Sequence, residues 1–100
     1  MPEPDWSFST RWLTTCTIDA AAFGMNAAGL REALQDQGIE TRPVWKPMHL
    51  QPLLAGAEYF QHGNSSVSDD LFADGLCLPS GSNLTDGEVD RVIDRIRERS

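Results

Sequence analysis

The stretch Arg42-Pro43-Val44-Trp45-Lys46-Pro47-Met48-His49 sets the conformation of the middle of this 100-residue chain. Each proline fixes its own φ and biases the residue before it, Arg42 or Lys46, toward an extended conformation. The stretch is therefore predicted to be extended and stiff. It carries a guanidinium, an indole, an ammonium and an imidazole within eight residues. Cationic and aromatic side chains so placed suit an anionic ligand that has rings to stack on.

Three segments are predicted to be strands: one before this stretch, one that overlaps it and one after it. Arg11–Asp19 is rich in β-branched and aromatic residues. Glu40–Trp45 ends at the second proline of the stretch, and Leu76–Leu78 is a short apolar run that ends at Pro79.

Three helices are predicted from their capping residues. The first begins after Asn26 and ends at Gly38, which favours a left-handed stop. The second begins at a serine, 66 or 68, and runs through residue 73. The third begins at Thr85, which has capping-box spacing to Glu88. This order of elements predicts an α+β fold with a small three-stranded sheet and helices mainly on one face.

Length and charge limit the classes of function. One hundred residues suit a single domain, predicted over 11–100 after a proline-rich lead-in over 1–10. The net charge of −7 argues against a nucleic-acid partner, because phosphate binding needs a basic face. No apolar run is long enough to span a membrane, and the first residues do not resemble a signal peptide. We therefore expect a cytoplasmic protein without a membrane partner.

The two cysteines, Cys16 and Cys77, lie in predicted strands. They are expected to be free thiols in a reducing compartment, with a disulfide between neighbouring strands as the alternative. Two separated cysteines offer too few ligands for a metal ion, so no metal site is predicted.

Three motifs in order resemble the C-terminal part of the DegT/DnrJ/StrS aminotransferases. They are Arg11-Trp12-Leu13, the stretch from Gly38 to Pro52 that contains Arg42–His49, and Gly75–Ser82 followed by Leu84-Thr85. Together they cover about Arg11 to Arg97. The resemblance implies the small domain of a fold-type-I enzyme that depends on pyridoxal phosphate (PLP), normally a homodimer. Such enzymes transfer an amino group, usually from glutamate, to a nucleotide-linked keto-sugar.

The cofactor chemistry of such an enzyme needs a lysine that forms a Schiff base, an acid at the pyridinium nitrogen and a phosphate site. The resemblance places these groups in an N-terminal domain that this chain does not contain. Lys46, the only lysine, does not match the family's PLP-lysine motif. We therefore expect a C-terminal fragment that has no catalytic residue, binds no PLP alone and is inactive without the N-terminal domain.

Four residues are predicted to contact the substrate: Arg42, Trp45, Lys46 and His49. The guanidinium of Arg42 fits a carboxylate or phosphate, or alternatively forms a surface ion pair with Glu40. Trp45 forms the wall of a sugar or cofactor pocket, or lies in the core. Lys46 supplies positive charge or is a solvated loop residue. His49 hydrogen-bonds the ligand or closes a turn.

Two further hypotheses concern the chain as a whole. The alternative function is a free-standing α+β binding or regulatory module without catalysis. If instead the chain belongs to a larger enzyme, an apolar patch should be exposed where the other domain docks. The candidates for this aromatic patch are Trp6, Phe8 and Trp12.

Overall fold

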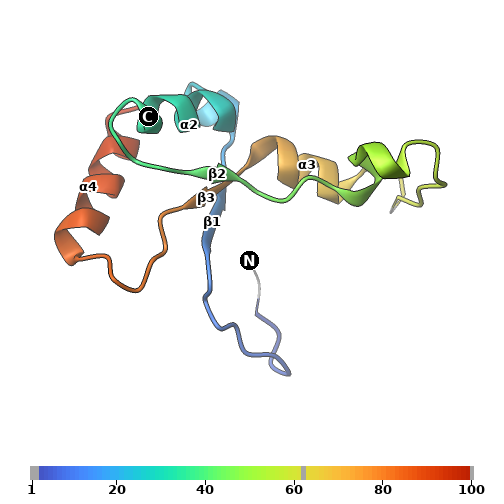
Figure 1. The fold of residues 1–100 in the computed structure, drawn as a ribbon, viewed down its shortest axis with the longest axis horizontal. Coiled ribbons are helices and arrows are strands. Elements are labelled where there is room, and N and C mark those ends of the chain that lie inside the picture. The colour runs from blue at the N-terminus through green and yellow to red at the C-terminus, as the bar shows by residue number, and fades with distance from the viewer. Residues whose placement is uncertain (1–2, 62, 100) are drawn as a thin grey trace.

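The computed structural model of the chain describes residues 3–61 and 63–99. Strands and helices alternate along the chain, and a long connection lies between the second and third strands (Figure 1). The elements, with η for 3-10 helix, are β1 (Thr14–Thr17), α1 (Ala20–Phe23), α2 (Ala27–Gln35), β2 (Arg42–Pro43), η1 (Met48–Leu50), η2 (Pro52–Leu54), α3 (Val67–Asp74), β3 (Gly75–Leu78) and α4 (Asp86–Arg97). The predicted α+β class is confirmed.

The sheet has the order β1-β3-β2, and both pairs of strands are antiparallel. Cys16 of β1 lies opposite Leu76, and Arg42 of β2 lies opposite Cys77. The last strand in the sequence is therefore the central one. It begins directly after α3, with no loop between Asp74 and Gly75.

Two predicted strands are longer than the observed ones. Arg11–Asp19 contains a strand only over Thr14–Thr17, and Glu40–Trp45 contains one only over Arg42–Pro43. Pro43 has no N–H to donate to a ladder, so pairing ends soon after it reaches this edge strand. Asp19 does not end the first strand but caps α1, since its carboxylate accepts from the backbone N–H groups of Ala21 and Ala22.

The core lies on one face of the sheet, beneath α2 and α4. Side chains at alternate positions of the strands, Cys16 and Leu76, point to the same face because they are register partners. Leu30 and Leu34 of α2 are fully buried against this face. The remaining core is contributed by Ile18, Ala27 and Ile39, with Phe23, Met25, Leu78, Val92 and Ile96 packed around it.

The predicted helix ends are confirmed in atomic detail. The Asn26 side chain accepts from the Gly29 N–H at 2.9 Å. Gly38 has φ 70° and lets the Ile39 N–H return to the Leu34 carbonyl at 2.9 Å, which is the long-range bond of a Schellman motif. These bonds fix the direction in which the chain leaves α2 for β2.

The two cysteines are free. Thr15 lies opposite Cys77, and Cys16 lies opposite Leu76, so the two thiols project from opposite faces of the sheet. This register explains why neighbouring strands do not bring them into a disulfide.

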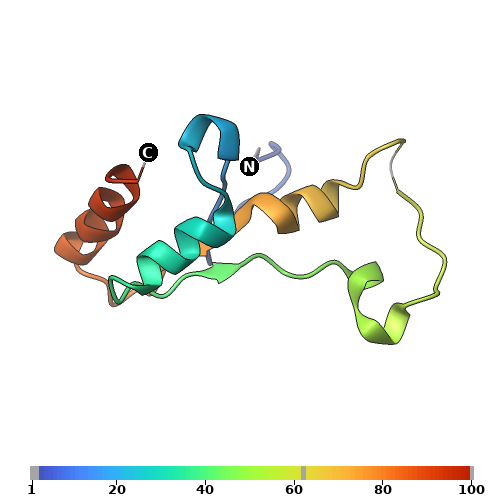
Figure 2. The ribbon, with the colours of Figure 1, turned by 90° about the horizontal axis from the view of Figure 1, so that it is seen from above.

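Two segments leave the body formed by the sheet, α2 and α4. Residues 3–13 extend away at one end of the sheet, and the segment that carries η1 and η2 extends at the side opposite α4 (Figures 1 and 2). The radius of gyration is 15.8 Å, against about 13 Å expected for a compact domain of this length. The chain therefore has an extended surface for its size.

Candidate functional site

The four predicted contact residues lie on one continuous segment but not in one pocket. Arg42 is in β2, Trp45 and Lys46 follow it in extended backbone, and His49 is in η1. The extended conformation predicted from the two prolines is observed between β2 and η1. Arg42 and Trp45 border a cleft, whereas His49 belongs to a separate polar cluster.

Arg42 forms an ion pair with Glu40, which is the alternative predicted for it from the sequence. Its Nε and Nη2 donate to Oε1 of Glu40 at 3.0 and 2.7 Å. The side chains of both residues are more than 70% exposed, at 78% and 75%. An exposed pair of this kind contributes little stability. The guanidinium of Arg42 therefore remains available to an anionic ligand that displaces Glu40.

Trp45 is not a core residue. It is 65% exposed, so the alternative of a core tryptophan is wrong. Its indole packs against that of Trp12, with 5.8 Å between ring centroids and 39° between ring planes. Trp12 itself is 71% exposed, and Trp6 and Phe8 are exposed as well, as expected for the three candidate side chains.

A cleft of about 600 Å³ lies between the end of β2 and the start of α4, and we call it the β2–α4 cleft. Leu13, Ile39 and Leu78 give it apolar walls. The charged residues that line it are Glu40, Arg42, Glu88 and Arg91, and Trp45 lines it as well. Two acids balance the two arginines, so a ligand would meet a cleft of mixed charge.

The setting of Lys46 does not suit a lysine that forms a Schiff base. A lysine that forms a Schiff base needs a desolvated pocket that lowers its pKa. Lys46 is exposed in the segment between β2 and η1, and its ammonium has no partner within 3–61 and 63–99. Its carbonyl accepts from Nε2 of Gln51 at 3.2 Å, which fixes the backbone and leaves the side chain free.

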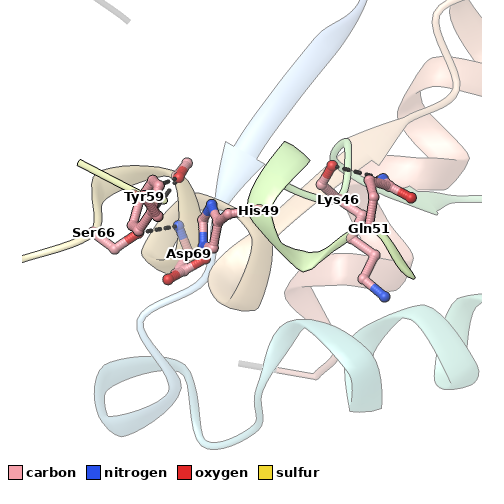
Figure 3. A network of polar contacts seen from close by, with 7 residues as sticks. Lys46, His49, Gln51, Tyr59, Ser66 and Asp69 are labelled. Atoms are coloured by element: carbon pink, nitrogen blue, oxygen red, sulfur yellow. Dashed lines mark hydrogen bonds and ion pairs between the residues drawn. The ribbon is translucent and has the colours of Figure 1, made fainter. Parts of the chain in front are cut away.

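His49 lies in a polar cluster with Tyr59, Ser66 and Asp69 (Figure 3). Its Nε2 is 2.8 Å from Oδ1 of Asp69, and its side chain is only 17% exposed. The imidazole stacks on the Tyr59 ring at a centroid distance of 3.7 Å. The Tyr59 hydroxyl lies 2.7 Å from Oγ of Ser66, the N-cap of α3.

Sequence reasoning missed Asp69 and Trp12 as neighbours of the predicted contact residues. Asp69 is 20 positions from His49 in the chain, and no helical or strand spacing relates the two. The stacking of Tyr59 on His49 ties the long loop to η1. For Asp69 the only sequence signal was its place in the first turn of a serine-capped helix.

Two classes of site find no support in the described part of the chain. No group of three or more histidine, cysteine or acidic side chains there is arranged to hold a metal ion. No helix in residues 3–61 and 63–99 has the length and hydropathy of a bilayer-spanning segment.

Comparison with known proteins identifies the family. The sequence profile of the DegT/DnrJ/EryC1/StrS aminotransferase family matches residues 1–97. The chain belongs to this family. The resemblance seen in the three sequence motifs is thereby confirmed, and with it the dependence of the family on pyridoxal phosphate.

Two curated relatives and one solved structure are similar to this chain over most of its length. EpsN of Bacillus subtilis (strain 168), named as a pyridoxal phosphate-dependent aminotransferase, is 46% identical over 95 residues, which are 94% of this chain and 24% of EpsN. GDP-perosamine synthase of Escherichia coli O157:H7 is 32% identical over 91% of the chain and 23% of its own length. The crystal structure of the aminotransferase TlmJ from Streptoalloteichus hindustanus superposes with a TM-score of 0.74 at 24% identity, over 98% of this chain and 24% of TlmJ.

The chain therefore spans about a quarter of the length of the aminotransferases it matches. The likeness to TlmJ establishes that this quarter has the fold of the corresponding part of an aminotransferase.

Proposed function

We propose that this chain is the C-terminal small domain of a PLP-dependent aminotransferase that acts on a nucleotide-linked keto-sugar. The observation that carries the proposal is the family match over residues 1–97 in a chain only a quarter as long as its relatives. The name of GDP-perosamine synthase supports a sugar nucleotide as the substrate class. PLP supplies the electron sink for amino transfer when it is bound. We assign the groups that hold it to an N-terminal domain.

In this proposal the chain binds and orients the substrate but performs no bond-making step. Arg42 donates hydrogen bonds to a phosphate or carboxylate of the ligand in place of Glu40, because its planar guanidinium matches the geometry of either group. Trp45 provides a flat face beside the β2–α4 cleft, and Lys46 adds an unpaired positive charge. His49 contributes a ring nitrogen at the far end of the segment. Glutamate is the proposed amino donor.

The parent enzyme is proposed to be a cytoplasmic homodimer, as the family resemblance implies. The exposed aromatic patch of Trp6, Phe8 and Trp12 is the surface that we assign to the N-terminal domain. Its burial would exclude water from the side of the domain where Trp45 lies, because Trp12 and Trp45 are in contact.

A chimera with EpsN tests this function. The chain replaces the 95 residues of EpsN to which it is 46% identical, and the affinities of uridine diphosphate and guanosine diphosphate are measured. Arg42→Ala and Trp45→Ala are each expected to weaken the better of the two ligands about tenfold. The absorption spectrum of bound PLP and its response to L-glutamate should not change. Affinities that are unaffected by both substitutions would reject the assigned contacts.

The chain by itself provides the complementary test. Incubated with PLP, it is expected to form no stoichiometric covalent adduct, and Lys46→Ala should leave the spectrum unchanged. A stable adduct that Lys46→Ala abolishes would contradict the proposal that the cofactor lysine lies in another domain.

A further inference from the structure

Three separate segments meet around the imidazole of His49. His49 comes from η1, Tyr59 from the long connection and Asp69 from the first turn of α3 (Figure 3). The ring is held on its face by the stacked phenol of Tyr59, with 18° between the planes, and at its edge by the carboxylate of Asp69. A single histidine side chain therefore ties together segments that are far apart in the sequence.

The contact between His49 and Asp69 requires a proton. Nε2 and Oδ1 are 2.8 Å apart and both are shielded from water, yet they are not aligned as a linear hydrogen bond and neither has another hydrogen-bond partner. An unprotonated ring nitrogen and a carboxylate oxygen would repel each other at this separation. The positive end of the α3 dipole favours a negative charge in the first turn. We therefore assign the proton to Nε2 and the charge to Asp69.

This assignment determines what the other ring nitrogen does. A neutral imidazole that carries its proton on Nε2 has a hydrogen-bond acceptor at Nδ1. The partner of Nε2 determines which of the two tautomers the ring adopts. Within 3–61 and 63–99, Nδ1 of His49 has no protein partner, and it is not among the fully buried polar atoms. Nδ1 is thus the nitrogen left to meet a ligand.

Tyr59 is held in turn by the N-terminus of α3. Its hydroxyl is 2.7 Å from Oγ of Ser66 and 3.4 Å from Oγ of Ser68. The same Ser66 oxygen accepts from the backbone N–H of Asp69 at 3.4 Å. The residue that stacks on His49 and the residue that pairs with it are therefore fixed to one turn of one helix. Movement of this turn would move both supports of the ring together.

We propose that Asp69 and Tyr59 are positioning residues for His49, which hold the ring with Nε2 engaged and present Nδ1 as a hydrogen-bond acceptor to the sugar-nucleotide substrate. This inference rests on the proposed function and adds to it. His49 touches the ligand, whereas Asp69 and Tyr59 act through His49. A histidine needed only for packing would not require a carboxylate at the edge of its ring, whereas this carboxylate fixes which ring nitrogen carries the proton.

Nitrogen-15 NMR of His49 in the full chain tests the arrangement without any ligand. At neutral pH the neutral ring is expected to carry its proton on Nε2, and its signals should show the ring-current shift of the Tyr59 stack. Asp69→Asn is expected to lower the ratio of the Nε2–H to the Nδ1–H form about tenfold, the size expected for loss of one charge-assisted contact. Asp70→Asn removes a neighbouring charge in the same helical turn and should leave the ratio unchanged.

The wild-type spectrum decides the tautomer by itself, so a variant that fails to fold does not prevent the test. A neutral His49 protonated on Nδ1 would overturn the proposal. Tyr59→Phe keeps the stacked ring and should keep the ring-current shift, whereas Tyr59→Leu should abolish it. An unchanged shift in Tyr59→Leu would equally contradict the role assigned to Tyr59.

The role toward the ligand is tested in the EpsN chimera with uridine diphosphate and guanosine diphosphate. His49→Ala and Asp69→Asn are each expected to weaken binding about tenfold, and the double variant no further, because both remove the same contact. If Arg42→Ala and Trp45→Ala weaken binding but Asp69→Asn behaves like Asp70→Asn, the positioning role is rejected and the proposed function stands. If Arg42→Ala, Trp45→Ala, His49→Ala and Asp69→Asn all leave binding unchanged, the proposed function itself fails.

Discussion

The indole of Trp12 lies against the indole of Trp45, with 5.8 Å between the ring centroids. Trp12 precedes β1 and Trp45 follows β2, and these strands flank β3 on its two sides. The contact therefore spans the width of the sheet and joins the lead-in to the segment that carries the predicted ligand contacts. Both rings remain mostly exposed, so the pair forms a surface and not a core.

This surface predicts self-association of the isolated chain. Apolar patches of this kind on a soluble domain mark interaction sites. Sedimentation velocity of the wild-type chain is expected to show concentration-dependent association, and replacing Trp6, Phe8 and Trp12 together by glutamine should reduce it. Leu53→Gln, which removes an exposed apolar side chain from η2, serves as the control. A wild-type chain that stays monomeric at high concentration would contradict the prediction.

Gly75 is predicted to tolerate no side chain. A Cβ at this position would lie 2.2 Å from the Leu71 carbonyl oxygen and 2.8 Å from a methyl of Val44. Because α3 enters β3 without a loop, the backbone has no room to relax, and Gly75→Ala should lower the free energy of unfolding by about 1–3 kcal/mol. Gly87→Ala is the control, since it meets nothing within 4 Å in α4 and should stabilise by about 0.5–1 kcal/mol. Urea denaturation measures both.

Local chemistry explains which parts of the fold the sequence predicts. Asn26 and Gly38 mark their helix ends because the side-chain cap and the left-handed glycine each satisfy backbone groups within a few residues. The short helix α1 is not among the predicted helices because the predicted strand over Arg11–Asp19 includes Asp19, although an N-cap residue before three alanines is a helix signal. The predicted strand over Glu40–Trp45 is longer than β2 because pairing depends on a partner 35 residues away, Cys77 for Arg42, as well as on local propensity.

The candidate site also contains residues that the local sequence predicts and a contact between distant residues that it does not. Arg42 and Trp45 were predicted from their residue types and spacing, and their exposure agrees with a role at a surface. The pairing of His49 with Asp69 was not predictable, because the two residues meet only through the path of the connection between η1 and α3. No periodicity encodes such a contact.

The capping box of α4 predicts a pH-dependent stability. Glu88 accepts from the backbone N–H and the hydroxyl of Thr85, both at 2.8 Å. These bonds lower the pKa of the Glu88 carboxyl, first through the backbone bond and then through the side-chain bond. Because the pKa of this carboxyl is lower in the folded state than in the unfolded state, its charged form stabilises the fold at neutral pH. That stabilisation is lost as the pH falls through the lowered pKa.

Glu88→Gln should therefore be less stable than the wild type at pH 7 but similar to it at pH 3, as measured by chemical denaturation. Asn26→Ala is the control, since the Asn26 cap of α2 has no reciprocal carboxylate. It should cost about 1 kcal/mol at both pH values. A difference between Glu88→Gln and the wild type that does not depend on pH would show that the carboxylate is not the stabilising group.

Cys16 is predicted to alkylate more slowly than an ordinary cysteine. Burial, and then the neighbouring thiol of Cys77, raise the pKa of Cys16. The thiolate is the reactive form, so a raised pKa lowers its population at neutral pH. The rate of iodoacetamide labelling, followed by mass spectrometry, should rise with pH only above the pH range in which an ordinary cysteine thiol ionises. Labelling at the model rate at neutral pH would disagree with this.

Glu40→Gln is predicted to strengthen the binding of a diphosphate to the EpsN chimera. Glu40 occupies the guanidinium of Arg42 at 2.7 Å, and a ligand anion must displace it. An exposed ion pair is worth about 0.2–1 kcal/mol, so freeing Arg42 should tighten binding by roughly 1.5–5-fold at low salt and by less at high salt. Glu58→Gln is the matched control, since it removes one charge from the long connection without releasing Arg42.

Isothermal titration with uridine diphosphate and guanosine diphosphate compares the two variants. Equal gains would mean that net charge and not the release of Arg42 is responsible. A gain that Arg42→Ala abolishes would tie the effect to this guanidinium, because only an arginine that takes part in ligand binding can transmit the loss of its intramolecular partner.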